Sequence, residues 1–270
     1  MPNNNNNNNT NTLRILCFGN SLTAGYWHYG LEYHPYAIKL KERLQQSITE
    51  EELLPPNTDI VIDVEGLPGD LAVSPPGRFL GRMEGRCISP YPTINILWIG
   101  CLCSKTAYDW VIVLGGTNDL AYGTFSPSQI FAALQQAWST ALTSSTSNNR
   151  TNVLALTIPE CSAISDRLTR RRDELNAKIL AHRAERFYTF DLHSALPYHS
   201  LSENERERIW DDGLHLTDEG YDLMGELVAG RLVELLKKNK KTTESEDGRK
   251  GKKIGDVGRD ELNKMAVTCR

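Results

Sequence analysis

Short apolar runs alternate with longer amphipathic segments along the middle of the chain. The run VIVL at residues 111–114 has no polar side, which is typical of a strand buried on both faces of a parallel sheet. Four further runs have a similar pattern. The predicted strands are residues 13–18, 60–65, 110–114, 153–157 and 187–192.

Segments of helical period stand between and after these strands. Thr217 precedes the last of them and is suited to cap it. Regular alternation of strand and helix favours a parallel sheet with helices on both faces. We therefore expect an α/β fold, a three-layer α/β/α sandwich with a five-stranded parallel sheet. The predicted helices are residues 35–48, 76–84, 127–142, 164–186 and 218–237.

Both ends of the chain depart from this pattern. Residues 1–12 include seven consecutive asparagines, and residues 237–270 are charged with scattered glycines, so neither end has the apolar surface needed to fold. We predict two disordered ends around one domain at residues 13–236. No secretory signal is visible, and the densest apolar stretch, residues 94–102, is too short to cross a bilayer. We expect a cytoplasmic protein with no integral membrane segment.

The formal net charge of −4 is unevenly distributed along the chain. From Lys237 onward there are 11 basic and 6 acidic residues, which leaves 19 basic and 28 acidic residues before it, so the body is at −9 and the tail at +5. An acidic body argues against a nucleic-acid partner, because phosphate contacts need a basic surface. A basic tail of this kind is more often solvated than bound to RNA or anionic lipid.

No metal site is expected from the cysteines and histidines. The six cysteines are too sparse to indicate a disulfide framework. Cys101 and Cys103 form a lone C-x-C without a second ligand pair, so half of a tetrahedral zinc site would be missing. His28 and His34 lie six residues apart with no carboxylate cluster nearby.

Residues that could take part in catalysis follow the first three predicted strands. Ser21 comes after the first strand and a glycine-assisted turn, Gly69 lies in the turn after the second, and Asn118 follows the third. In an open parallel sheet the carboxyl ends of the strands share one crevice. A serine there needs a base to become a nucleophile, and an uncharged amide suits an oxyanion. Each residue alone is as consistent with an ordinary turn.

A base is available before the last predicted helix. In the segment DDGLH, Asp212 stands three residues before His215 and is close enough to orient its ring.

Together these blocks resemble the SGNH hydrolases, also called GDSL esterases, over about residues 13–236. The blocks are FGNSLTAG at 18–25, LPGD at 67–70, GGTND at 115–119 and DDGLH at 211–215. The resemblance implies a flavodoxin-like fold, Ser21 as nucleophile, and Asp212 with His215 as the rest of a triad. It also implies an oxyanion hole made of the backbone N–H groups of Ser21 and Gly69 and the Asn118 side chain. Such a site needs neither a metal nor an organic cofactor.

Two features depart from the family's pattern. Asn20 stands where the GDSL signature usually has aspartate, so any orienting role of that carboxylate passes to an amide. Residues 87–103 are an apolar, proline-containing insertion without strand or helix periodicity. This insertion is either a lid or hairpin, or translated non-coding sequence, and its lack of pattern favours the second.

The expected function is hydrolysis of a small-molecule, lipid or sugar ester through an acyl-enzyme. Acyl transfer to an alcohol or sugar acceptor, and a binding protein on an inactive copy of the fold, are the alternatives. Retention of both Ser21 and His215 argues against the inactive copy. No phosphate-binding loop of the G-x-x-x-x-G-K-[ST] type is present. The aromatic residues between 26 and 36 either wall an acyl or sugar pocket or seal the sheet. The oligomeric state is left open.

Overall fold

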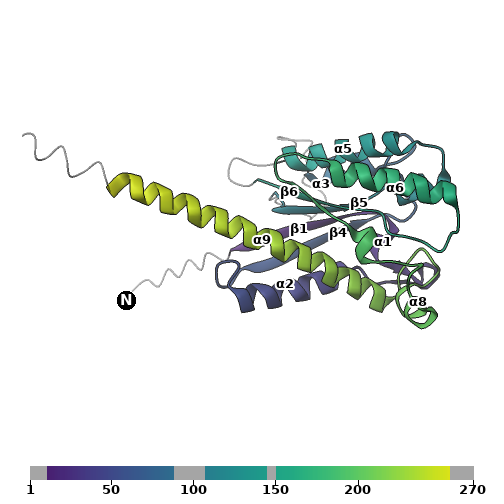
Figure 1. Ribbon diagram of the computed structural model, residues 1–270, viewed down its shortest axis with the longest axis horizontal. Coiled ribbons are helices and arrows are strands. Elements are labelled where there is room, and N and C mark those ends of the chain that lie inside the picture. Colours follow the sequence, from purple (N-terminus) through teal and green to yellow (C-terminus); the bar gives the residue numbers. More distant parts are fainter. Residues whose placement is uncertain (1–10, 88–106, 145–149, 256–270) are drawn as a thin grey trace, which may run out of the picture.

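The computed structural model describes residues 11–87, 107–144 and 150–255, and at its centre is a five-stranded sheet. All four strand pairs are parallel, in the order β4-β1-β5-β6-β7. The predicted α/β/α fold with a five-stranded parallel sheet is therefore confirmed (Figure 1). The strands are β1 (Thr12–Gly19), β4 (Asp59–Gly66), β5 (Trp110–Leu114), β6 (Asn152–Leu156) and β7 (Phe187–Phe190).

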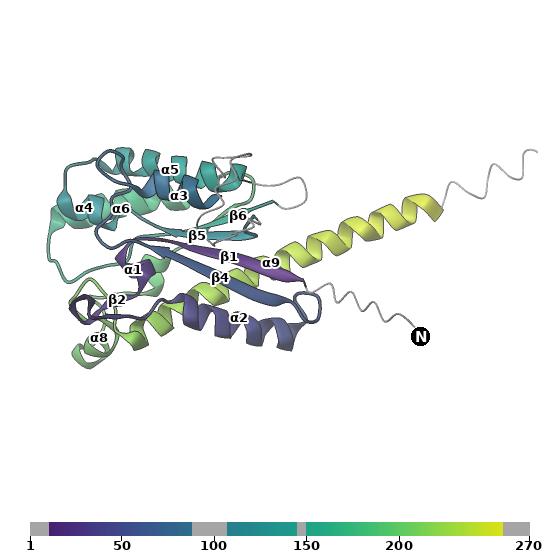
Figure 2. The same ribbon diagram turned by 180° about the vertical axis from the view of Figure 1, so that it is seen from behind.

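Helices cover both faces of the sheet (Figures 1 and 2). One layer contains α2 (Ala37–Glu51) and α9 (Asp218–Gly255), and the other contains α3 (Phe79–Cys87), α5 (Pro127–Thr143) and α6 (Asp166–Ala181). Successive side chains of a strand point to opposite faces, so the strands contribute to two separate apolar cores. All five residues of β5 are buried, which explains its continuous apolar run.

Several short elements were not among the sequence predictions. They lie in the segments that connect the strands and the long helices. The mostly charged helix α8 begins with a capping box of Ser202 and Glu205. The short elements are α1 (Ser21–Ala24), β2 (Tyr26–Trp27), η1 (His28–Gly30), β3 (Glu32–Tyr33), α4 (Thr117–Tyr122), α7 (Leu192–Ala195) and α8 (Glu203–Ile209).

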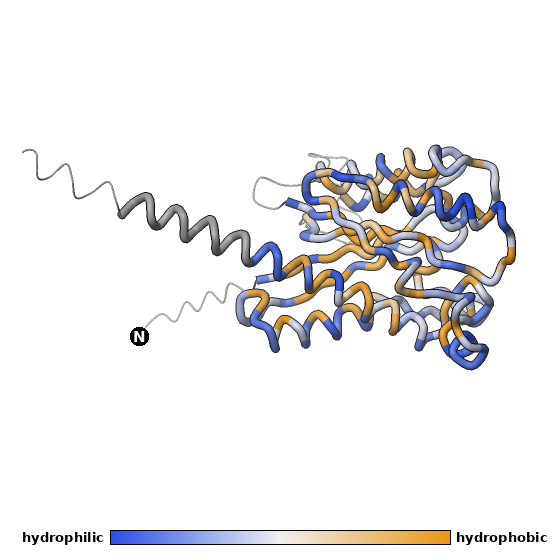
Figure 3. The backbone as a smooth tube through the Cα atoms, viewed as in Figure 1, coloured by the Kyte–Doolittle hydropathy of each residue, from blue (hydrophilic) through white to orange (hydrophobic). Residues whose placement is uncertain are grey.

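The last helix is longer than predicted. We expected it to end at Lys237, but α9 continues to Gly255, so the predicted end of this helix was wrong. Its first half packs on the body through buried residues up to Leu236. Figure 3 shows apolar residues along this part of the helix. Beyond that point lysine and glutamate favour a helix and no proline interrupts it, so a helix nucleated by packing continues into the charged segment.

Other parts of the predicted domain organisation fall outside the described residues. These parts are residues 1–10, most of the insertion at 87–103, and residues 256–270. Cys87 itself is the last residue of α3. Within residues 11–87, 107–144 and 150–255, no helix has both the length and the apolar composition that a membrane span requires.

Candidate active site

Three neighbouring strands deliver the candidate residues to one edge of the sheet. Gly19 at the end of β1 is in register with Gly66 of β4 on one side and with Leu114 of β5 on the other. The turns that follow these three strands therefore begin side by side. Ser21, Gly69 and Asn118 lie in these turns, and the loop before α9 brings His215 to the same edge.

Ser21 and His215 are in direct contact. Ser21 is the first residue of α1 and is 7% exposed. Its Oγ lies 2.9 Å from His215 Nε2, across 194 positions in sequence. This is the distance at which a histidine can accept the serine proton.

Asp212 fixes the other side of the histidine ring. Its Oδ2 lies 2.7 Å from His215 Nδ1, while Oδ1 accepts hydrogen bonds from the backbone N–H groups of His215 at 2.8 Å and Leu214 at 3.0 Å. Partial burial would raise the pKa of the Asp212 carboxyl, but these hydrogen bonds outweigh it and hold the pKa below its ordinary value. Asp212 is therefore a carboxylate at neutral pH and favours a proton on Nδ1, which leaves Nε2 facing Ser21 as acceptor.

The loop that carries this pair is closed on itself. Trp210 and Leu216 form an antiparallel bridge at its base, and the Asp211 N–H donates to the His215 carbonyl at 2.9 Å. Gly213 turns the loop with φ of +79°, a conformation that favours glycine. Its carbonyl accepts from the Ser162 N–H at 2.6 Å, so the loop is also tied to the segment after β6.

The aromatic segment after Ser21 contains both buried and exposed rings. The Tyr26 ring lies 4.5 Å from the His215 ring, and the Tyr221 hydroxyl donates to the Tyr26 carbonyl at 2.7 Å. Tyr36 is fully buried in the core, as a ring that seals the sheet would be. Tyr29 and Tyr33 are exposed. The segment thus covers one side of the histidine.

Asn118, one of the expected oxyanion donors, is bonded to the loop that carries Gly69. Gly69 has φ of +77°, and the carbonyl of Asp70 after it accepts a hydrogen bond from Asn118 Nδ2 at 2.8 Å. Asn20 Nδ2 donates to the same oxygen. Asn20 therefore links the loop of Ser21 to the loop of Gly69.

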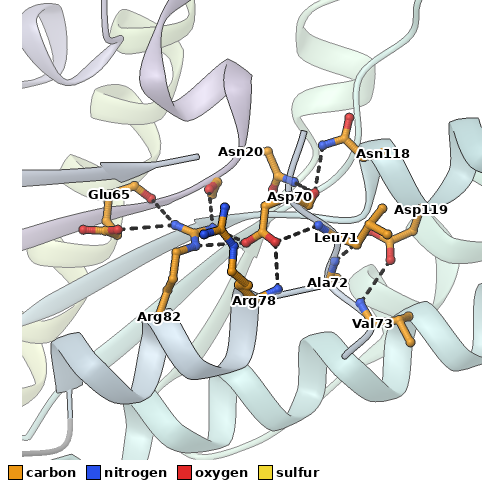
Figure 4. Close-up of polar contacts among 11 residues, drawn as sticks. Asn20, Glu65, Asp70, Leu71, Ala72, Val73, Arg78, Arg82, Asn118 and Asp119 are labelled. Carbon is orange, nitrogen blue, oxygen red and sulfur yellow. Dashed lines mark hydrogen bonds and ion pairs between the residues drawn. The ribbon is translucent and has the colours of Figure 1, made fainter. Parts of the chain in front are cut away.

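Three residues of this region were not assigned a role from the sequence. The Asp119 carboxylate accepts from the N–H groups of Ala72 at 2.9 Å and Val73 at 3.0 Å, and burial raises its pKa although these bonds oppose the rise. Asp70 and Arg82 form an ion pair beneath the same loop (Figure 4). Asp70 and Asp119 end the motif blocks LPGD and GGTND, and this position could have marked them in the sequence. Arg82 lies in α3, outside the motif blocks, so no sequence pattern marked it.

A groove of about 570 Å³ opens beside Gly69. It runs between the loop after β4 and the loop after α4, and both apolar and polar groups line it. Gly69 faces open space, because a Cβ added there would have no atom within 4 Å. The lining residues are Pro68, Gly69, Asp70, Leu71, Pro76, Gly77, Arg78, Tyr122, Thr124 and Phe125.

The two histidines considered as metal ligands pair with carboxylates instead. His34 Nε2 lies 2.8 Å from Asp222 Oδ1, and His28 Nδ1 lies 3.3 Å from Glu32 Oε1. Over the described parts of the chain, no three histidine, cysteine or acidic side chains are grouped so as to hold a metal ion.

Comparison with known proteins gives a family and a set of similar structures. A model of the GDSL-like Lipase/Acylhydrolase family matches residues 17–223. No curated protein matches the chain.

Solved structures share the fold at low sequence identity. A carbohydrate acetylesterase from Sinorhizobium meliloti aligns with a TM-score of 0.54 and 18% identity, covering 83% of this chain and 99% of that one. The native aryl esterase of M. smegmatis aligns with a TM-score of 0.55, 22% identity and the same coverage. A lipase/acylhydrolase from Enterococcus faecalis aligns with a TM-score of 0.53 and 19% identity, covering 82% of this chain and 96% of that one.

Proposed function

Because this chain belongs to the GDSL-like lipase/acylhydrolase family, whose members act on esters, we propose that it is a serine esterase with Ser21, His215 and Asp212 as its triad. The observation that carries the proposal is the continuous chain of contacts from Asp212 Oδ2 through the His215 ring to Ser21 Oγ, at 2.7 and 2.9 Å. A serine, a base and a carboxylate that orients the base are the parts that this chemistry needs.

The proposed reaction has two steps. His215 Nε2 takes the Ser21 proton as Oγ attacks the ester carbonyl, and the resulting oxyanion is held by the N–H groups of Ser21 and Gly69 and the Asn118 amide. His215 then gives the proton to the leaving alkoxide, which departs as an alcohol and leaves an acyl-enzyme. Water, deprotonated by His215, then attacks the acyl carbon. The bond from this carbon to Ser21 Oγ breaks, the acid is released, and His215 returns the proton to Ser21 Oγ.

We also propose that the groove beside Gly69 receives one of the two groups attached to the ester carbonyl. A carbonyl oxygen directed at Gly69 places its substituents next to this groove, where Tyr122 and Phe125 offer apolar contact. Two similar structures are named as a carbohydrate acetylesterase and an aryl esterase, so acetyl esters of sugars and aryl alcohols are the first substrates to test.

The test is hydrolysis of p-nitrophenyl esters, from acetate to long acyl chains, by the wild type and by Ser21→Ala. We expect turnover that depends on Ser21, with a chain-length optimum that reflects the size of the groove. Equal rates for the two proteins on every ester would reject the esterase proposal. Repeating the assay with an added acceptor alcohol and analysing the products would show whether the acyl group goes to water or to the alcohol.

A further inference from the structure

A nearly buried arginine lies beneath the candidate oxyanion hole. Arg82 is on α3, and its side chain is 13% exposed, with the guanidinium 4.7 Å from the centre of the Phe18 ring. Its ion-pair partner Asp70 is 3% exposed. Burying two charges is costly unless their hydrogen bonds are satisfied, so such a pair needs to be well provided with partners.

The guanidinium contacts three segments that converge on the site (Figure 4). Its Nε donates to the Asp70 carboxylate at 2.9 Å, one terminal nitrogen donates to the Gly19 carbonyl at 2.9 Å, and the other donates to the Glu65 carbonyl at 3.2 Å. Gly19 ends β1 two residues before Ser21, and Glu65 is the penultimate residue of β4. One planar group thus ties together the ends of two strands and the Gly69 loop, and a lysine ammonium lacks the fork geometry to do so.

The Asp70 carboxylate extends this network into the loop itself. Its other oxygen accepts from the N–H groups of Leu71 at 3.0 Å and Arg78 at 2.8 Å. Its backbone carbonyl accepts from Asn118 and Asn20. Both the side chain and the backbone carbonyl of Asp70 are therefore fixed. Asp70 directly follows Gly69, whose N–H is a proposed oxyanion donor.

We propose that Arg82, acting through Asp70, is a positioning residue that holds the Gly69 N–H and the Asn118 amide at the distance the oxyanion requires. The inference rests on the proposed esterase function. Oxyanion donors work because they are already in place when charge develops, so a displacement of about 1 Å is expected to slow the reaction by up to about 10²-fold.

The neighbouring Arg86 provides a matched control. It lies one turn further along α3, donates to the Glu65 carboxylate at 2.6 Å and is more exposed than Arg82. Both arginines pair with Glu65. Arg82 also bonds to Asp70 and Gly19, and this is the difference that the comparison tests.

The experiment compares Arg82→Met, Arg82→Lys and Arg86→Met with the wild type, using p-nitrophenyl acetate. We expect Arg82→Met to lower kcat about 10- to 100-fold with KM changed by less than about twofold. Binding of phenylboronic acid, which becomes a tetrahedral analogue when Ser21 Oγ adds to its boron, should weaken in similar proportion. Arg82→Lys should recover little of kcat, and Arg86→Met should behave as the wild type. If kcat, KM and boronic acid affinity of Arg82→Met match those of Arg86→Met, the inference is overturned.

Amide hydrogen exchange in residues 66–73 separates this inference from the proposed function. Exchange in this segment should be faster in Arg82→Met than in Arg86→Met, whether or not the ester chosen is a substrate. Unchanged exchange overturns the positioning role even if kcat falls. Faster exchange in an enzyme with no Ser21-dependent turnover supports the role of Arg82 in holding the loop and rejects the esterase. If Arg82→Met does not fold, Asp70→Asn, which preserves the shape of the side chain, is measured in its place with the same expected outcomes.

Discussion

The Asn118 side chain is held in place by a hydrogen bond within the protein. The Asn118 amide nitrogen carries two hydrogens, one of which is donated to the Asp70 carbonyl at 2.8 Å. The first bond fixes the direction of the second hydrogen, which is the one that can meet a substrate oxygen. The proposed oxyanion donor is thus oriented before substrate arrives, and its contribution should be seen in the transition state rather than in substrate binding.

Substitution of Asn118 tests this expectation. Asn118→Ala should lower kcat by roughly 10²- to 10³-fold with little change in KM, because the lost bond forms only as the oxyanion develops. Asn118→Asp keeps the shape and replaces the donor by an acceptor, so its loss should be at least as large. Steady-state kinetics on p-nitrophenyl acetate measure both. A variant with full turnover would remove Asn118 from the oxyanion hole.

At the scale of elements, the strands could be predicted and the short helices could not. The runs that form β1, β5 and β6 are apolar on both sides because helices cover both faces of the sheet, and this leaves a clear mark in sequence. Helix α8 is mostly polar and was missed, although Ser202 and Glu205 have the spacing of a capping box. Helix α4 has 6 residues, fewer than two turns and too few for any periodicity to appear.

Site residues divide in the same way. Ser21, Gly69 and Asn118 could be anticipated because each follows a strand, and the register of β1, β4 and β5 then brings their turns together. The contacts of Arg82 and Tyr26 join segments far apart in the chain, such as the approach of Tyr26 to His215. No local pattern encodes a contact of this kind.

The histidine loop offers a prediction at this scale. Gly213→Ala forces a side chain into a positive φ, and the added Cβ would lie 2.4 Å from Ser162 Oγ. We expect the free energy of unfolding to fall by about 1–3 kcal/mol and kcat to fall about tenfold or more as His215 shifts. Chemical denaturation and ester kinetics measure the two effects.

A second glycine gives the control for this substitution. Gly230 is exposed within α9, and an added Cβ there would have no atom within 4 Å. Gly230→Ala should leave kcat unchanged and raise the free energy of unfolding by up to about 1 kcal/mol, because alanine favours a helix. If Gly213→Ala were as stable and active as Gly230→Ala, the loop would not depend on this turn.

At the scale of the whole molecule, α9 belongs to two environments. Its first part packs against one apolar core of the sheet. Further along, Lys237 forms an ion pair with Glu51 of α2, and Lys240 Nζ donates to the Glu52 carbonyl at 2.7 Å. Its last turns extend beyond the body (Figure 1). The folded domain should therefore need α9 only as far as Lys240.

Removal of residues 241–270 tests this division. The truncated chain should keep the kcat of the full chain and a Tm within about 2 °C of it, because the packed residues are retained. Its helical circular dichroism should decrease by the contribution of the deleted turns. A large loss of activity or of Tm would mean that the projecting segment supports the body. Unchanged helical signal would contradict a helix that continues to Gly255.

The direction of α9 has a practical consequence for handling the protein. The helix starts three residues after His215, at the carboxyl edge of the sheet, and ends past the opposite edge, where β1 also begins (Figures 1 and 2). A fusion partner, affinity label or solid support joined near either residue 11 or residue 255 would therefore lie on the side away from Ser21. A protein immobilised in this way would present the edge that carries Ser21 and His215 to the bulk solution, with the projecting part of α9 acting as a built-in spacer.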